Sequence, residues 1–402
     1  MPKGSDESDF KTDRGALPYE IITRILADFW GLLDNKDSTS PSAQLLGLRL
    51  VSKAWSTAII STYFVYIHLH HAKRAKTLLD NWTDALYAPG LLCPVKRLRI
   101  DNLWYAEAGL EAECDTEEVL MDQALILDFT YSMGAPPSMV KAVKALKALN
   151  ELHITHPGSC SRTIWEHPGG GSCTEGIYDL KSLGKLLSAV SQIKSLKLEH
   201  NDLEGLRLKP NALPNLKHFR FTTHPENIEG LTHICETAKN SLKCVQVFSD
   251  GHQEDIDPIF EPIKDSLEAC FTAFLDQFSR SALEMEFPKL RILGTQHPPR
   301  GVGSGLNWLN WPMLQNVRTL FMLDFLTRDY WKGILKSAEV NAFEKVPNLK
   351  HIILANSIRK IDPQIVEAFK SRGIQCHFTP MLSPEEVMEW DSKLHNPLNG
   401  PA

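Results

Sequence analysis

The sequence predicts an α/β fold in which a parallel-sheet solenoid follows a small all-α domain at the N-terminus. Two patterns lead to this prediction: apolar residues at helical spacing near the N-terminus, and short segments of alternating apolar residues that recur from residue 95 onward. The chain of 402 residues is 43% hydrophobic and 23% charged, as expected for a protein with a substantial core. Its net charge of −6 argues against nucleic-acid binding driven by bulk positive charge.

Helical signals begin directly after a polar N-terminal tail at 1–14, which we expect to be disordered. Pro18 suits the first turn of a helix, where its missing N–H group would have no partner. A second helical pattern spans 45–60. Helices this short are not stable alone, so they pack on each other or on a partner. The first apolar stripe consists of Ile21, Ile22, Ile25, Leu26 and Phe29.

The C-terminal region repeats a segment of the form apolar, polar, any, apolar, any, apolar. Alternation of this kind is typical of a strand with one buried face. Several copies start 23 to 32 residues apart, close to the period of leucine-rich repeats, about 20–29 residues. Gaps of 54, 44 and 48 residues either hide a degenerate repeat or carry an insertion. The copies start at residues 95, 149, 193, 216, 242, 290, 317, 349 and 374.

The repeat pattern fixes a strand register that the structure can test. Leu196, Leu198, Phe219 and Phe221 fall on the buried face, and Lys197 and Arg220 fall between them on the exposed, concave face. Helical stretches lie between the copies, as a solenoid of strand, loop and helix requires. They are expected at 138–148, 180–191, 263–285 and 363–370.

The last two predicted helices have clear end signals. Asp362 and Pro363 mark the start of one helix, and Gly373 follows its end. Ser383 and Glu386 form a capping box that opens a terminal helix, which we expect to cover the last repeat. The predicted boundaries are a helical connector at 69–94, an irregular leucine-rich-repeat-like solenoid at 95–380, and a capping helix with tail at 381–402.

The N-terminal helices carry two separated motifs that support a family resemblance. Residues 17–26 read Leu-Pro-Tyr-Glu-Ile-Ile-Thr-Arg-Ile-Leu, and residues 48–55 read Leu-Arg-Leu-Val-Ser-Lys-Ala-Trp. Together they resemble an F-box, here assigned to 15–68. The sequence departs from the family in a longer polar insertion at 34–44. An F-box followed by irregular leucine-rich repeats resembles the F-box proteins abundant in fungi.

The resemblance implies a substrate adaptor of an SCF-type cullin–RING ubiquitin ligase. The F-box would dock on a Skp-family linker protein, which joins it to the cullin–RING ligase core, and the repeats would hold an unknown target protein. The resemblance also implies that the adaptor has no catalytic residues and needs no cofactor. The expected linker-binding residues are Leu17, Pro18, Glu20, Ile21, Ile25, Leu26, Leu48, Val51 and Trp55.

A mixture of aromatic and basic residues in the C-terminal half is the candidate target-binding surface. Trp, Tyr and Arg are enriched among the residues that contribute most to protein interfaces. Part of this set is also expected to be solenoid core. The candidates are Trp308, Trp311, Arg318, Arg328, Tyr330 and Trp331.

Two other functions remain open from the sequence. The chain could be an F-box scaffold that acts outside a ligase, or a metal-dependent enzyme that uses the loop with His156, Cys160, His167 and Cys173. The spacing of that loop differs from paired zinc ligands, so we predict no metal site. Eight scattered cysteines without a Cys-x-x-Cys pair, no secretory signal and no apolar run of membrane-spanning length predict a cytoplasmic or nuclear protein without membrane or nucleic-acid partners.

Overall fold

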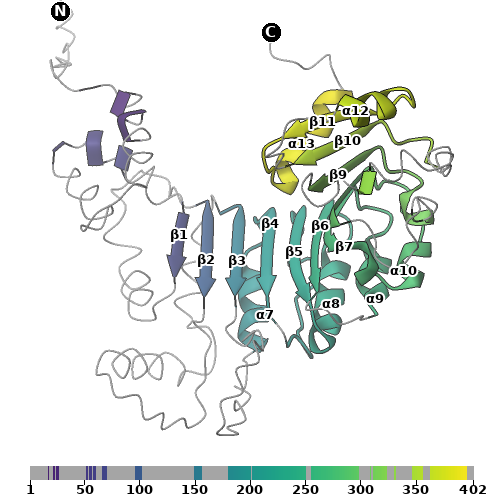
Figure 1. Ribbon diagram of the computed structural model, residues 1–402. Helices are drawn as coiled ribbons and strands as arrows, with labels where there is room; N and C mark the ends of the chain where they lie inside the picture. The colour runs from purple at the N-terminus through teal and green to yellow at the C-terminus, as the bar shows by residue number, and fades with distance from the viewer. Residues whose placement is uncertain are drawn as a thin grey trace, which may run out of the picture.

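The computed structural model shows a curved sheet with helices along one side (Figure 1). Among the helices of the described ranges, none has the length and hydrophobicity needed to cross a bilayer. The structure describes residues 17, 21, 22, 24–26, 51, 52, 54–56, 58, 59, 66–69, 96–101, 149–155, 180–200, 202–249, 255–297, 308, 311–323, 330, 331, 346–355 and 363–395.

One parallel sheet of eleven strands organises the described chain. The strands lie in sequence order, so each pairs with the strand before it in the chain. This order is the one that strand–helix repeats stacked side by side produce. The strands are β1 (Tyr66–Leu69), β2 (Arg97–Asp101), β3 (Glu151–Thr155), β4 (Ser195–Glu199), β5 (His218–Thr223), β6 (Cys244–Ser249), β7 (Ala269–Phe274), β8 (Ile292–His297), β9 (Thr319–Leu323), β10 (His351–Ala355) and β11 (Gln375–Thr379).

Short helices connect successive strands. The α-helices are α7 (Leu180–Ala189), α8 (Ile228–Ala238), α9 (Asp257–Phe260), α10 (Arg280–Glu284), α12 (Pro363–Lys370) and α13 (Pro384–His395). The 3₁₀ turns are η2 (Pro225–Asn227), η3 (Glu261–Ile263), η4 (Leu275–Gln277) and η6 (Pro312–Leu314). The predicted ends of α12 are confirmed at Pro363 and at Gly373, whose φ of 72° is the left-handed conformation that commonly follows a helix.

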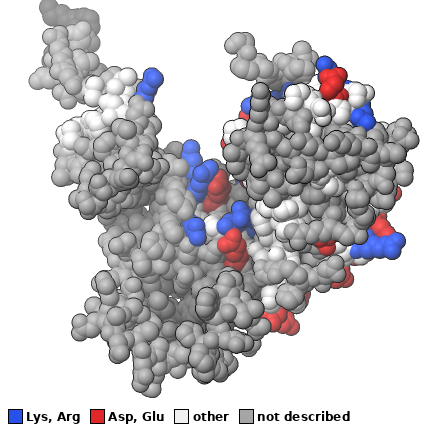
Figure 2. Space-filling view, viewed as in Figure 1, with Lys and Arg blue, Asp and Glu red and all other residues white. Residues whose placement is uncertain are grey.

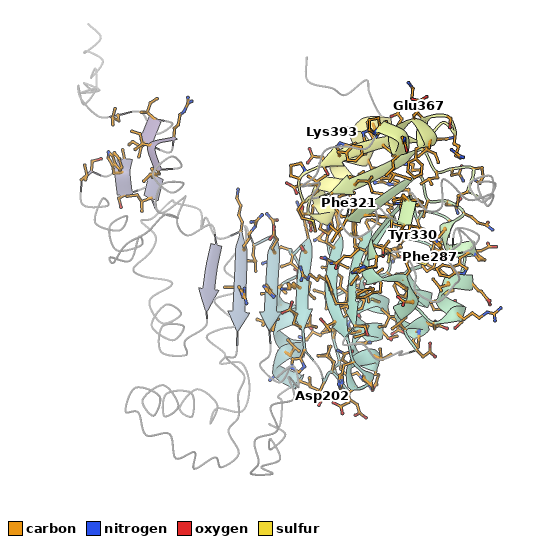
Figure 3. The ribbon with its side chains drawn as sticks, in the orientation of Figure 1. Asp202, Phe287, Phe321, Tyr330, Glu367 and Lys393 are labelled. Atoms are coloured by element: carbon orange, nitrogen blue, oxygen red, sulfur yellow. The ribbon has the colours of Figure 1, made fainter. Side chains whose placement is uncertain are left out.

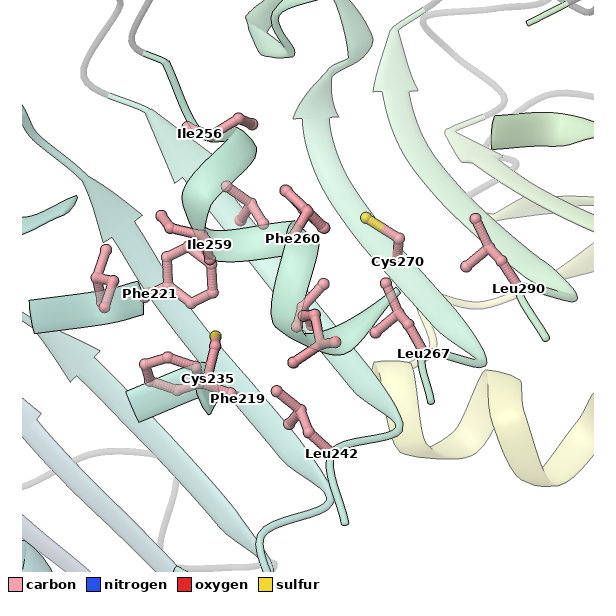
Figure 4. Close-up of a cluster of buried hydrophobic side chains, with 14 of the residues drawn as sticks. Phe219, Phe221, Cys235, Leu242, Ile256, Ile259, Phe260, Leu267, Cys270 and Leu290 are labelled. Atoms are coloured by element: carbon pink, nitrogen blue, oxygen red, sulfur yellow. The ribbon is translucent and has the colours of Figure 1, made fainter. Parts of the chain in front are cut away.

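The main core lies between the sheet and the helices α7, α8, α9, α10 and α12. Leu196, Leu198, Phe219 and Phe221 are buried, which confirms the predicted strand register, and Lys197 and Arg220 alternate with them on the other face. Further along the sheet, Phe260 on α9 packs in the same core beside Cys235 and Cys270 (Figure 4). The leucines at every second position therefore form one continuous apolar layer across successive strands.

A second core covers the opposite face of the C-terminal strands. Phe271, Phe321 and Ile353 lie on β7, β9 and β10, and Val387 of α13 packs on them with Trp390 nearby. Phe321 and the C-terminal half of α13, marked by Lys393, are labelled in Figure 3. The prediction places the terminal helix over the last repeat. α13 does contact β11, where Trp390 meets His377, and it extends further over the second face of β7, β9 and β10, because those strands are apolar on both faces.

Two strands were not predicted. β7 falls inside the expected helix at 263–285, so the prediction of one helix there is wrong, and the strand divides the gap of 48 residues. Its sequence Ala-Cys-Phe-Thr-Ala-Phe lacks alternation, because residues on both of its faces are buried. β1 adds a strand at the end of the region assigned to the all-α domain. The helix expected at 138–148 lies outside the described residues.

Gly294 shows how closely the second core is packed. A Cβ atom at this position on β8 would lie 2.1 Å from Cδ1 of Phe271 on the neighbouring strand. The Phe271 ring also meets Phe321 edge-on, with ring centroids 6.1 Å apart. Glycine therefore makes room for an aromatic side chain beneath α13.

Candidate functional site

The described N-terminal residues separate into a buried side and an exposed apolar side. Ile22, Leu26, Ala58 and Ile59 are buried together, with Trp55 packed against them. Ser52 Oγ accepts a hydrogen bond from the Trp55 backbone N–H at 3.3 Å, as expected at the start of a helix. The two N-terminal helical segments thus share a small core of their own.

The exposed side is unusually apolar. Leu17, Ile21, Ile25 and Val51 have 46%, 45%, 40% and 62% of their surface exposed. Ile21 and Ile25 are four residues apart, so they lie on one side of the first helical segment, which Leu17 precedes in the chain. Of the remaining predicted linker-binding residues, Leu26 is buried and Trp55 is half-buried, while Pro18, Glu20 and Leu48 lie outside the described residues.

A groove lies over the second face of strands β2–β6. It has a volume of about 420 Å³ and is bounded by Ser383, Pro384 and Glu385 at the start of α13. Figure 2 shows basic and acidic side chains interspersed over this part of the sheet. On the C-terminal strands, α13 packs against this second face instead.

Ion pairs order the floor of the groove. Arg97 Nε lies 2.9 Å from Glu151 Oε2, and Lys197 Nζ lies 2.6 Å from Glu199 Oε1. His153, whose Nε2 is 3.8 Å from Glu199 Oε2, and Lys197 lower the pKa of Glu199 to about 2. Burial, and the positive charge of Arg220 nearby, lower the pKa of Lys197. The floor therefore carries fixed charges of both signs.

Arg220 is the cation of the groove that lacks an ion-pair partner among the described residues. Its guanidinium lies over the Phe248 ring, 4.7 Å from the centroid. Its Nε atom is buried without a hydrogen-bond partner in the described part of the chain. A buried donor of this kind gains from an acceptor supplied by a bound molecule.

The N-terminus of α13 forms one wall of the groove. The helix begins with the predicted capping box: Ser383 N–H donates to Glu386 Oε2 at 2.7 Å, and Glu386 N–H donates to Ser383 Oγ at 3.2 Å. Glu385 Oε1 then lies 3.1 Å from His218 Nδ1 on β5. This contact with His218 lowers the pKa of Glu385, so the two side chains fasten the helix start to the sheet.

A buried carboxylate fastens the other end of α13. Asp391 is completely buried and accepts hydrogen bonds from Arg318 Nε at 3.1 Å, Arg318 Nη2 at 2.6 Å and Thr319 Oγ1 at 2.6 Å. Arg291 Nη1 also contacts this carboxylate. The Asp391 carboxylate is thus the shared counter-charge of two arginines, which lie at the starts of the adjacent strands β8 and β9.

The predicted aromatic target surface is largely interior. Trp308 and Trp331 are buried, which removes both from any target surface. Tyr330 is half-buried and its hydroxyl accepts a hydrogen bond from Trp308 Nε1 at 2.7 Å, and Trp311 packs against the main core. Arg318 is engaged with Asp391. Arg328 lies outside the described residues.

The sequence predicts only some of the residues that line the groove. Lys197 and Arg220 were placed on the exposed face, but their neighbours across the strands were not identified. The available signal was the polar position between the apolar residues of each strand, which brings Arg99, His153, Lys197 and Arg220 side by side once the register is known, while Arg97 pairs with Glu151 two positions earlier. The contribution of α13 had no local signal.

The thiols of the described cysteines are poor nucleophiles. Burial raises the pKa of Cys235, Cys244 and Cys270 far above the ordinary range, and that of Cys376 to about 12. Groups of three side chains able to hold a metal ion do not occur within the described ranges. The loop with His156, Cys160, His167 and Cys173 lies outside them.

Comparison with known proteins leaves the site to be interpreted from its own geometry. The sequence matches no family model and has no significant similarity to a curated protein. The proposed function therefore rests on the exposed N-terminal apolar side and the charged groove.

Proposed function

We propose that this chain is the substrate-recognition adaptor of an SCF-type cullin–RING ubiquitin ligase. Residues 15–68 form an F-box that binds a Skp-family linker, and the repeats hold a target protein for ubiquitination. The chain itself carries out no covalent chemistry. It acts by raising the effective concentration of the target near the ligase core.

The exposure of Leu17, Ile21, Ile25 and Val51 carries the proposal. These residues belong to the motifs that resemble an F-box, and a monomer gains nothing from placing four large apolar side chains in water. Ile22, Leu26, Ala58 and Ile59 already supply the segment with its own core. A partner surface that accepts an apolar helix face accounts for the four apolar side chains that this core leaves exposed.

The repeats form a leucine-rich-repeat-like solenoid in this proposal. Sequential parallel pairing from β1 to β11 supports it, as does the spacing of 23 to 32 residues between successive strand starts from β4 to β11. The groove over β2–β6 is then the target surface, in place of the buried Trp308 and Trp331. Its fixed charges of both signs suit a polar peptide segment of the target.

Binding to a purified Skp-family linker tests the F-box. Ile21→Asp combined with Val51→Asp places charges on the exposed apolar side without touching the buried residues. We expect linker affinity to fall by more than about tenfold, because an interface cannot bury these charges without a partner. The measurement is a titration by calorimetry, with the thermal unfolding midpoint recorded for each variant.

Arg24→Asp is the matched control, since Arg24 is also exposed and helical in the same segment. It should bind the linker at close to wild-type affinity. Equal binding by wild type and the Ile21/Val51 double variant would refute the F-box assignment. Adding a cullin then separates the two F-box functions: a ligase adaptor assembles into the ternary complex, whereas a scaffold outside a ligase stops at the linker.

A further inference from the structure

The residue that precedes each strand occupies the same place in every repeat. Its carbonyl oxygen accepts hydrogen bonds from two successive N–H groups of the next repeat: Arg318 O, for example, accepts from Lys350 N at 2.8 Å and His351 N at 2.9 Å. Equivalent side chains therefore form a row along the end of the sheet at which the strands begin. Neighbours in this row are one strand spacing apart, about 4.8 Å. From β2 to β10 these residues are Lys96, Asn150, Lys194, Lys217, Lys243, Glu268, Arg291, Arg318 and Lys350.

The C-terminal part of this row opens into a pocket, here called the basic pocket. It has a volume of about 400 Å³, and its charged lining residues are Lys289, Arg291, Arg318 and Lys350, together with His395 of α13. Acidic side chains are absent from its lining within the described part of the chain. Asp265 and Glu286 line a neighbouring hollow that shares only Pro288 and Asn316 with it.

Two carboxylates behind the basic pocket hold its guanidinium groups in place. Glu268 Oε2 accepts from Arg291 Nε at 3.3 Å and Nη2 at 3.2 Å, and buried Asp391 binds both arginines. Arg318 uses Nε and Nη2 for Asp391, so its Nη1 group makes no hydrogen bond within the described residues. The donors that remain are thus oriented before any ligand arrives.

The charge balance of the basic pocket favours a doubly charged anion. Four cations and two carboxylates leave a net charge of +2. Lys289 and Lys350 are exposed and have no ion-pair partner in the described ranges, so they account for this excess. The C-terminus of α13 carries a partial negative charge that repels an anion. This repulsion is weak, because the partial charge is small compared with the four full positive charges of the pocket.

The rim of the basic pocket is also fixed by hydrogen bonds. Asn316 Nδ2 donates to Phe287 O at 3.2 Å, and Asn348 Nδ2 donates to Gln315 O at 2.9 Å. These bonds tie each strand-preceding turn to the turn of the repeat before it. The cations therefore project from a rigid edge rather than from a free loop.

We propose that the basic pocket binds a tetrahedral dianion of the phosphate-monoester class. A phosphate monoester carries a charge of about −1.5 to −2 near neutral pH, which matches the excess of the pocket. Its oxygens accept from several donors at once, as Arg318 Nη1 and the two lysine ammonium groups offer them. This site is separate from the groove over β2–β6 and does not depend on the F-box assignment.

Titration of the full chain with inorganic phosphate tests the site, at physiological ionic strength to suppress diffuse binding. Calorimetry should show one saturable site in the wild-type protein. Lys289→Ser combined with Lys350→Ser should weaken binding by about tenfold or more, because both excess charges are removed. These side chains are exposed and unpaired among described residues, so the thermal unfolding midpoint should stay unchanged.

Lys239→Ser, which removes an exposed lysine after α8, should bind phosphate as wild type does. A phosphoserine peptide and its unphosphorylated form distinguish the two sources of the group. Tighter binding of the phosphopeptide than of inorganic phosphate identifies a site for a modified protein, and equal binding identifies a site for the free anion. Absence of saturable binding by both phosphate ligands, or unchanged binding in the double lysine variant, would overturn the proposal.

Discussion

At the scale of single residues, Asp391 has the greatest structural consequence. It is a fully buried carboxylate, and its oxygens satisfy Arg291, Arg318 and Thr319 on two adjacent strand starts. A buried charge is tolerated only where partners compensate its loss of hydration. The same contacts orient the arginines of the basic pocket, so one side chain serves both the packing of α13 and the geometry of a surface site.

We expect Asp391→Asn to lower the free energy of unfolding by about 2–4 kcal/mol, because the two arginines lose their shared counter-charge. Urea unfolding followed by circular dichroism measures this change. Glu389→Gln is the control, since Glu389 is exposed and, among the described residues, pairs with Lys393 one turn away, with 2.8 Å between their charged atoms. That change should leave the free energy of unfolding close to the wild-type value, because solvent screens an exposed ion pair. Similar losses for both variants would contradict the role assigned to burial.

At the scale of elements, α13 packs against a cluster of histidine rings. Its Trp390 ring meets His351 and His377 edge-on, with centroids 6.0 Å and 4.4 Å away. His351 Nδ1 lies 3.2 Å from His377 Nε2, and the His395 ring packs on His351. Protonation of both rings would weaken this contact, because two imidazolium groups at such a distance repel each other.

Burial, followed by repulsion from His377 and His395, lowers the pKa of His351 to about 4. The unfolded imidazole titrates near 6.5, so between these values the unfolded state binds more protons. We therefore expect the contact of α13 to weaken as pH falls from 6.5 to 4. Amide hydrogen exchange over 384–395, corrected for intrinsic rates, measures the loss.

His351→Gln should remove much of this pH dependence, since glutamine stays neutral throughout. Burial also lowers the pKa of His200, which directly follows β4, to about 4. His200 therefore contributes its own pH dependence, and hydrogen exchange has to be compared segment by segment. An identical pH profile for 384–395 in wild type and variant would show that His351 does not control the helix.

At the scale of the whole molecule, stability is carried by a core that continues from strand to strand. Leu198 on β4 lies in this core next to Ile154 on β3 and Phe221 on β5. We expect Leu198→Asp to cost more than about 4 kcal/mol, because it buries an unpaired charge and removes apolar contacts on both sides. Thermal unfolding followed by calorimetry should show loss of the cooperative transition. Lys185→Asp on the exposed side of α7 should leave the transition in place.

The sequence by itself determined the repeat register and the ends of the clearest helices. Leucines at every second position bury one face of a strand whatever lies beyond it, so Leu196, Leu198 and Phe219 were placed correctly. The signals around α12 and α13 are equally local, because caps, proline and glycine act within a few residues. The exposed apolar positions Ile21 and Val51 were named from a motif, and their exposure agrees with that assignment.

Only the tertiary structure decided which faces are covered and which charges meet. β7 has no alternation because α13 buries its second face, and Trp308 became core because neighbouring repeats enclose it. Asp391 meets Arg318 across 73 positions of sequence, and the basic pocket exists because strand starts stack in register. A residue's own neighbours in the chain set its local conformation, whereas burial and charge pairing depend on residues that only the folded sheet brings together.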